Sequence, residues 1–257
     1  MSLIIAIAGK GGTGKTTVSS LIVSQLAKRN KGSVLAIDAD PNSNLAEALG
    51  LKIKEDIGGI VDSVAKKPDI VPVGMSKDRY IDYRIQTSIV EENGFDLLTM
   101  GRPEGPGCYC YVNNLLRTLI KNIANEYDYV VIDNEAGFEH FSRKTMRRAD
   151  RLLLVSDSSE AGLRAAQRIV CLVKELEIEI KNAQLILNRM PVWTEQCSVP
   201  TIRDRLSGLG IETIGIIPED EKVLALSRYG KAITGLDESS LALAEVKKIL
   251  DKVLGEK

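Results

Sequence analysis

Two kinds of apolar pattern alternate along the chain. Short continuous apolar runs predict buried strands at residues 3–8, 33–38, 94–100, 129–133, 151–156, 183–188 and 211–217. Apolar residues at helical spacing predict helices at 16–29, 45–49, 112–126, 160–176, 220–227 and 238–254. Strands that alternate with helices in this way predict an α/β fold, with a mostly parallel sheet and helices on both faces.

Four further stretches interrupt this pattern or give weaker signals. Glycine and proline interrupt residues 53–73, and residues 80–90 are expected to be part strand and part helix. A basic helix is expected at 142–149, and a loop at 191–200. These stretches do not disturb the alternation of strands and helices around them.

A glycine-rich segment joins the first predicted strand to the first predicted helix. Its residues are Gly9, Lys10, Gly11, Gly12, Thr13, Gly14, Lys15, Thr16 and Thr17. They fit the pattern G-x-x-x-x-G-K-[ST] of a phosphate-binding loop. Glycines allow several backbone N–H groups to point at one anion, and the helix N-terminus adds its positive dipole end. We therefore expect Lys15 to reach the β- and γ-phosphates of a nucleotide and the Thr16 hydroxyl to bind Mg²⁺.

Aspartates follow two of the predicted strands. Asp38 and Asp40 leave the strand at 33–38, and Asp133 ends the apolar strand at 129–133. Carboxylates at the ends of parallel strands, beside a phosphate site, predict the position of Mg²⁺ and water. Ordinary turn chemistry is the alternative reading of Asp38 and Asp40.

The strand at 183–188 ends in Asn188, followed by Arg189. An amide both donates and accepts hydrogen bonds, which suits the edge of an adenine ring. Asn188 is therefore a candidate base-reading residue, and a strand-end turn residue is the alternative.

Two closely spaced cysteines mark a second informative stretch. Cys108 and Cys110 follow a loop shaped by glycine and proline and precede the predicted helix at 112–126. A helix N-terminus favours thiolates, which are good ligands for metals. Two thiolates fill half of a four-coordinate site, so a two-fold dimer would complete it. Two spectator thiols are the alternative, while Cys171 is expected to fill a core gap and Cys197 to be structural.

Composition narrows the class of protein. The 257 residues include 34 Lys and Arg and 35 Asp and Glu, for a net charge of -1. This balance argues against a dominant nucleic-acid surface. No apolar run approaches a membrane span, and we expect no signal peptide before the first strand. We expect residues 1–257 to form one cytoplasmic P-loop ATPase domain with reduced thiols, which binds neither nucleic acid nor membrane.

Lys10 adds a feature that the general phosphate loop does not require. The loop resembles the deviant Walker A loop of the MinD/ParA/nitrogenase iron protein class of ATPases. The resemblance implies that Lys10 crosses a dimer interface to the partner's nucleotide, and that Asp40 orients the attacking water with Asp38 near the Mg²⁺ shell. It also implies that Asn188 reads the base and that a loop starting at Pro218 closes over the adenine.

The stretch from Met100 to Cys110 is more specific. With it, essentially the whole chain resembles the nickel-insertion accessory ATPases of carbon monoxide dehydrogenase maturation, the CooC type. The resemblance implies ATP and ADP as nucleotides, and one Ni²⁺ or Zn²⁺ held by Cys108 and Cys110 of two protomers. It implies a homodimer driven by nucleotide or metal, with carbon monoxide dehydrogenase as the client.

Three relatives of the same fold are alternatives. A nitrogenase-iron-protein-like reductase would need a second cluster cysteine, but the matching position is Ala136. An iron–sulfur scaffold ATPase also uses paired cysteines, usually further along the chain. A partitioning or positioning ATPase would need a membrane-binding C-terminal helix or a basic DNA-binding surface, and the helix at 241–254 mixes both charges.

Overall fold

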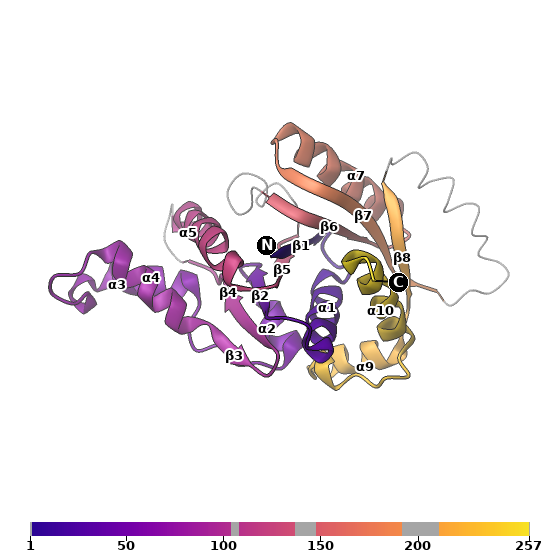
Figure 1. The fold of residues 1–257 in the computed structure, drawn as a ribbon, viewed down its shortest axis with the longest axis horizontal. Coiled ribbons are helices and arrows are strands. Elements are labelled where there is room, and N and C mark those ends of the chain that lie inside the picture. Colours follow the sequence, from indigo (N-terminus) through magenta and orange to yellow (C-terminus); the bar gives the residue numbers. More distant parts are fainter. Residues whose placement is uncertain (1, 104–107, 137–147, 192–210, 257) are drawn as a thin grey trace.

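An eight-stranded sheet forms the centre of the protein in the computed structural model, which describes residues 2–103, 108–136, 148–191 and 211–256. The strand order across the sheet is β3-β4-β2-β5-β1-β6-β7-β8 (Figure 1). The strands are β1 (Leu3–Gly9), β2 (Val34–Ala39), β3 (Val90–Glu92), β4 (Phe95–Thr99), β5 (Tyr129–Asn134), β6 (Arg148–Ser156), β7 (Glu179–Met190) and β8 (Glu212–Pro218).

Every neighbouring pair of strands is parallel except β3 with β4. β1 lies between β5 and β6, so the phosphate loop leaves the sheet near its middle. Asp38 and Asp133 are register partners on β2 and β5. The parallel arrangement therefore brings the strand ends that carry the predicted acidic residues to one edge of the sheet.

Helices cover both faces of the sheet. They are α1 (Lys15–Arg29), α2 (Asn44–Leu49), α3 (Ile57–Lys66), α4 (Lys77–Ser88), α5 (Cys108–Ile123), α7 (Glu160–Glu175), α9 (Glu221–Arg228) and α10 (Leu241–Leu254). Short 3-10 turns are η1 (Pro68–Ile70), η2 (Ala124–Glu126) and η3 (Ile233–Gly235). In the described part of the chain, none of these helices has the length and apolar character needed to cross a membrane.

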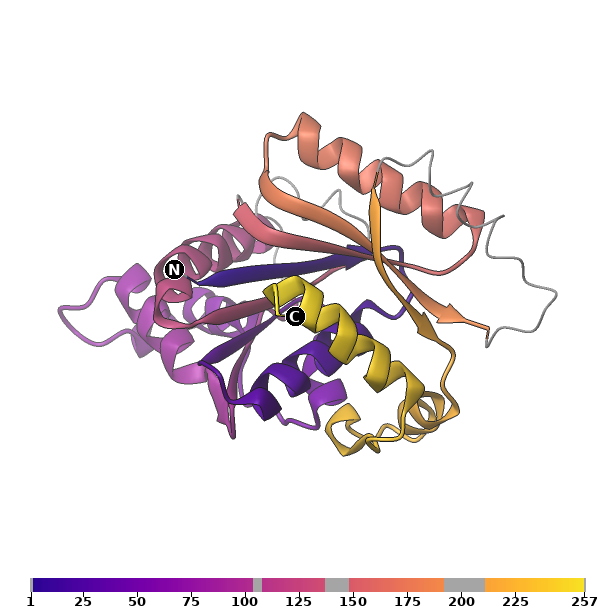
Figure 2. The same cartoon turned by 45° about the vertical axis from the view of Figure 1, so that its right-hand side comes forward.

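The two faces contain separate aliphatic cores. α1, α2, η3 and α10 pack on one face, and α3, α4, α5 and α7 pack on the other. α1 and α10 lie side by side in both views of the molecule (Figure 2). Arg29 at the end of α1 ties them together with hydrogen bonds to Asp251 (2.6 Å) and Glu256 (2.9 Å).

The predicted α/β fold with a mostly parallel sheet is confirmed, and so are the strands and the long helices within a few residues. Residues 80–90, expected to be part strand and part helix, contain most of α4, which ends at Ser88, and the first residue of β3, Val90. The antiparallel pairing of β3 at the edge of the sheet was not predicted. Gly94 turns β3 back onto β4 with a φ of 92°, a conformation that glycine adopts without strain.

Two expectations about cysteine positions were wrong. Helix α5 begins at Cys108, so the helix includes Cys108 and Cys110 instead of following them. Cys171 is exposed on α7 and does not fill a core gap. The expected basic helix at 142–149 and loop at 191–200 fall mainly outside the described residues, and so does Cys197. The described residues of the first belong to β6.

Candidate functional site

The phosphate loop depends on glycine at particular backbone positions. Gly9 has a φ of 154°, and a Cβ placed there would lie 2.1 Å from the carbonyl oxygen of Val155. Gly14 has a φ of 91° and directly precedes α1, where its carbonyl accepts the N–H of Val18 at 3.0 Å. A Cβ on Gly14 would meet the Asn188 amide at 2.3 Å. The loop can curl against its neighbours because these residues have no side chain.

The two lysines of the loop differ in burial. Lys15 is only 7% exposed, and its ammonium donates to the Lys10 carbonyl at 3.4 Å. Burial lowers the pKa of Lys15, while the charges of Asp133 and Asp40 oppose that shift. Lys10 is itself exposed. Lys15 therefore faces the concave side of the phosphate loop, whereas Lys10 faces solvent.

Asp133 provides a buried carboxylate beside the start of α1. It is 1% exposed and accepts a hydrogen bond from the Ser19 hydroxyl at 2.8 Å. Burial raises the pKa of Asp133 to about 6, against the opposing effects of hydrogen bonds from Thr16 and Ser19 and the charge of Lys15. A carboxylate next to the Thr16 hydroxyl is the donor set that Mg²⁺ uses beside a triphosphate. The residues present thus fit a magnesium ion, which when bound would neutralise phosphate charge.

Asp38 and Asp40 organise the loop between β2 and α2. Asp38 is fully buried, and its carboxylate accepts the backbone N–H groups of Asp40 (3.1 Å) and Leu45 (2.8 Å). Burial, reinforced by the nearby charge of Asp133, raises the pKa of Asp38 to about 7. Asp40 is partly exposed, and it accepts both the backbone and the side-chain N–H of Asn42. Asp38 therefore fixes the loop that presents Asp40, and a role for Asp38 near Mg²⁺ stays a prediction.

Asn188 and Arg189 reach from β7 to the phosphate loop. The buried Asn188 amide donates to the carbonyl of Thr13 at 2.8 Å, and the Arg189 guanidinium donates to the carbonyl of Gly12 at 2.8 Å. Arg189 has a φ of 56°, an uncommon value for a residue with a side chain. The structure thus brings both residues to the nucleotide loop, where they hold the loop carbonyls. Base reading by Asn188 stays a prediction.

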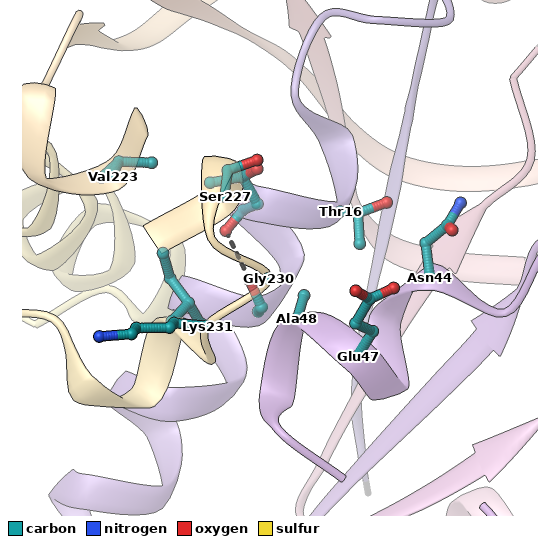
Figure 3. A pocket seen from close by; sticks show the side chains of 11 residues that line it. Thr16, Asn44, Glu47, Ala48, Val223, Ser227, Gly230 and Lys231 are labelled. Carbon is teal, nitrogen blue, oxygen red and sulfur yellow. Dashed lines mark hydrogen bonds between the residues drawn. The ribbon is translucent and has the colours of Figure 1, made fainter. Parts of the chain in front are cut away.

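A groove and a cavity lie beside the phosphate loop. Asn188, Arg189 and Pro218 line the narrow groove together with Thr17 and residues of α9. A wider cavity of about 350 Å³ opens between the start of α1, helix α2 and the segment from α9 to η3 (Figure 3). Thr17 borders both spaces. A nucleotide whose phosphates occupy the loop would therefore have its nucleoside in this region.

Comparison with known proteins identifies the family. Residues 4–233 match the family described as CbiA, the CobQ/CobB/MinD/ParA nucleotide binding domain. The chain belongs to this family. An uncharacterized ATP-binding protein of Methanocaldococcus jannaschii is 38% identical over 257 residues, which cover 99% of this chain and 100% of that protein.

Other members of the CobQ/CobB/MinD/ParA family are also similar along most of the chain. The carbon monoxide dehydrogenase accessory protein CooC of Rhodospirillum rubrum is 30% identical over 237 residues, or 88% of this chain and 87% of that protein. The solved MinC:MinD cell division protein complex of Aquifex aeolicus contains a chain with a TM-score of 0.71 and 29% identity. That match covers 100% of this chain and 97% of the other.

The segment after β4 is connected by backbone hydrogen bonds to the end of β2 and to the start of α3. The Met100 N–H donates to the Asp38 carbonyl at 2.8 Å, and the Met100 carbonyl accepts the Gly58 N–H at 2.9 Å. Gly101 has a φ of 65°, and a Cβ there would lie 2.0 Å from the Asp56 carboxyl carbon. Residues 101–103 are therefore held between β2 and the start of α3, ahead of the cysteines.

Two features of this family member's site were not predicted from the sequence. Ser19 holds Asp133, and Glu47 lines the wide cavity. Ser19 had a usable signal, because it lies one helical turn after Lys15 and so faces the same side of α1. Glu47 had none, because its position beside Thr16 depends on how α2 packs.

Proposed function

We propose that this protein is an ATPase that carries nickel or zinc at a dimer interface and assists nickel insertion into an enzyme such as carbon monoxide dehydrogenase. The similarity to CooC supports this choice within the MinD/ParA family. The observation that carries the proposal is the hydrogen-bond connection, through Asp38, between the loop that carries Asp40 and Met100, where the segment that leads to the cysteines begins.

The nucleotide half of the proposal rests on the phosphate loop. Lys15 faces the β- and γ-phosphates, and Thr16 with Asp133 provides the place for Mg²⁺. Asp40, on a partly exposed loop, orients the attacking water. Catalysis in such a site comes from positioning and charge stabilisation, so hydrolysis is slow until the site is completed.

A second protomer completes that site. Lys10 is exposed at the tip of the loop, where it can extend toward the nucleotide of a facing copy. ATP shifts the monomer–dimer equilibrium only if it binds the dimer better. Contact between Lys10 and the partner's phosphates supplies that difference, so ATP drives dimer formation.

The connection through Asp38 relates nucleotide state to the cysteines. Its carboxylate holds the N–H of Asp40, while its carbonyl holds the N–H of Met100. From Met100 the chain continues through Gly101, which lies against Asp56 at the start of α3, and leads on to α5, which begins at Cys108. A change at Asp40 on ATP binding or hydrolysis is therefore transmitted through Asp38 to Met100, ahead of the cysteines.

The metal half of the proposal assigns the cysteines. Cys108 and Cys110 of two protomers supply four thiolates, which suit tetrahedral Zn²⁺ or square-planar Ni²⁺. Both residues lie in the first turn of α5, where the helix dipole favours thiolate. Metal binding should also weaken as the pH falls, since protons compete for thiolates.

Metal stoichiometry and oligomeric state test the proposal. Anaerobic apoprotein titrated with Ni²⁺ or Zn²⁺ should bind one ion per dimer, and Cys108→Ser or Cys110→Ser should abolish that binding while ATP binding persists. Lys10→Ala should dimerise with metal but fail to dimerise with ATP in sedimentation experiments. Cys171→Ser is the matched control, because Cys171 is an exposed thiol on α7, and it should bind metal normally.

Four results would contradict the proposal. One metal ion per monomer, or full binding by Cys110→Ser, would exclude a shared site. An iron–sulfur chromophore in anaerobic protein would favour the reductase or scaffold alternatives. Equal ATP-driven dimerisation of Lys10→Ala would remove the role of Lys10.

A further inference from the structure

The cavity of about 350 Å³ beside the phosphate loop has an acidic side chain that no part of the mechanism uses. Thr16 and Thr17 form its inner end at the start of α1. Glu47 and Asn44 come from α2, and Ser227 comes from α9. The cavity is thus built by three segments that are far apart in the sequence.

The order of groups in a nucleotide determines what enters this cavity. The N-terminal end of the helix after a phosphate loop receives the α- and β-phosphates. The group joined to the α-phosphate is the ribose, so the ribose is the first part of the nucleotide to lie beyond Thr16 and Thr17. The cavity opens at these two residues, whereas the neighbouring groove lined by Asn188 has a volume of only about 40 Å³.

The carboxylate of Glu47 restricts the chemistry of its partner. A carboxylate repels phosphate and accepts hydrogen bonds, so it favours hydroxyl or amino donors. In an adenine nucleotide these donors are the ribose hydroxyls and the adenine amino group. The ribose is the nearer of the two to the α-phosphate, and its two vicinal hydroxyls can both donate to one carboxylate.

Glu47 is available for this contact. Figure 3 shows its carboxylate on the side of the cavity that faces Thr16, whereas the Lys231 amine points away from the cavity. A Cβ on Gly230 would lie 3.6 Å from a Glu47 oxygen, so the carboxylate lies close to the turn after α9. Glu47 is exposed, so a substitution there leaves the core intact.

We propose that Glu47 accepts hydrogen bonds from the ribose hydroxyls of the bound nucleotide and makes the site selective for ribonucleotides over deoxyribonucleotides. This assignment rests on the proposed nucleotide site and adds its sugar specificity. Because Glu47 lies on α2, which follows the loop of Asp40, the assignment places this part of the chain beside both the sugar and the phosphates. Glu47 acts as a specificity-determining residue, with no part in the chemical step.

Binding of diphosphates tests the assignment without interference from hydrolysis. Calorimetric titration with Mg²⁺ should compare ADP, 2′-deoxy-ADP, 3′-deoxy-ADP and inosine diphosphate. Wild-type protein should bind ADP roughly tenfold more tightly than at least one deoxy form, the usual effect of a hydrogen bond to a charged acceptor. Glu47→Ala should bind ADP and that deoxy form equally, and Glu47→Gln should retain part of the preference.

Lys231→Ala is the matched control, because Lys231 borders the same cavity with its amine directed away, and it should keep the wild-type ratio. Equal binding of ADP and both deoxy forms by wild-type protein would overturn the assignment. Full discrimination in Glu47→Ala would also overturn it. A Glu47-dependent preference for ADP over inosine diphosphate, without one over the deoxy forms, would mean that Glu47 reads the base instead. If no nucleotide binds, the proposed ATPase function fails and this assignment fails with it.

Discussion

Replacing Asp38 with asparagine should change how the stability of the protein depends on pH. Asp38 is fully buried at the end of β2, and its folded-state pKa is raised from 3.8 to about 7 by burial and by the charge of Asp133. A raised carboxyl pKa means that the folded protein prefers the protonated acid. The resulting stability is present at low pH and is lost as the pH rises toward about 7. Asparagine has a similar shape and no such titration.

The size of the effect follows from the linkage between protonation and folding. Each unit of pKa difference corresponds to about 1.4 kcal/mol. From about pH 5 to about pH 7, the wild-type free energy of unfolding should fall by roughly 2–3 kcal/mol relative to Asp38→Asn. Asparagine leaves one of the two backbone N–H groups of Asp40 and Leu45 without an acceptor, at a cost of about 1–3 kcal/mol. That cost is independent of pH, so it adds a constant to the difference in free energy of unfolding between the two proteins and leaves the dependence of this difference on pH unchanged.

Urea denaturation followed by circular dichroism measures this difference. Both proteins should be unfolded at several values between about pH 5 and pH 8, with a metal chelator and without nucleotide. The same pair should also be compared in an Asp133→Asn background. Removing the charge of Asp133 removes one cause of the raised pKa of Asp38, so the pH-dependent difference should shrink.

Parallel pH profiles for wild-type protein and Asp38→Asn would refute the reasoning. They would mean that Asp38 has the same pKa in the folded and unfolded chains. A wild-type stability that rises relative to the variant over this range would mean that the folded state favours the carboxylate. In either case burial and the charge of Asp133 would not raise the pKa of Asp38 in the way that the structure indicates.

Three further predictions concern the loop, the water-orienting residue and the nucleotide groove. Asp40→Asn should bind ATP with little loss but hydrolyse it at least tenfold more slowly, since the proposed water contact is weakened; a wild-type rate in a phosphate-release assay would contradict that role. Gly14→Ala should lower stability by about 2 kcal/mol in a denaturant titration, because φ is 91° and the new Cβ meets the Asn188 amide; unchanged stability would contradict the geometry. Hydrogen bonds from Ser240 and Ala242 outweigh burial and hold the pKa of Asp220 below 3.8. Wild-type protein should therefore be more stable than Asp220→Asn above about pH 4, and thermal unfolding should show this difference disappear as the pH falls further. A stability difference that grows at lower pH would contradict the lowered pKa of Asp220.

Local patterns determined much of the fold. Apolar runs and helical spacing depend on neighbouring residues, so they located the central strands and long helices. The phosphate loop was equally readable, because its function depends on backbone conformations that glycine adopts and on a lysine at a set spacing. The misplaced start of α5 shows the limit of this reasoning, since the sequence around Cys108 predicts a loop and a helix but not the residue that joins them.

Only the tertiary structure decided which distant residues meet. The order of strands brings Asp38 beside Asp133 and joins Asp38 to Met100 by a backbone hydrogen bond. Packing of α2 against the turn after α9 brings Glu47 into the cavity beside Thr16. These contacts depend on the crossover connections that set the strand order and on how side chains of different elements pack together. Apolar periodicity indicates which face of a helix or strand is buried, but not which other element covers that face. For this reason the chemistry of the phosphate loop could be predicted from the sequence, and the cavity beside it could not.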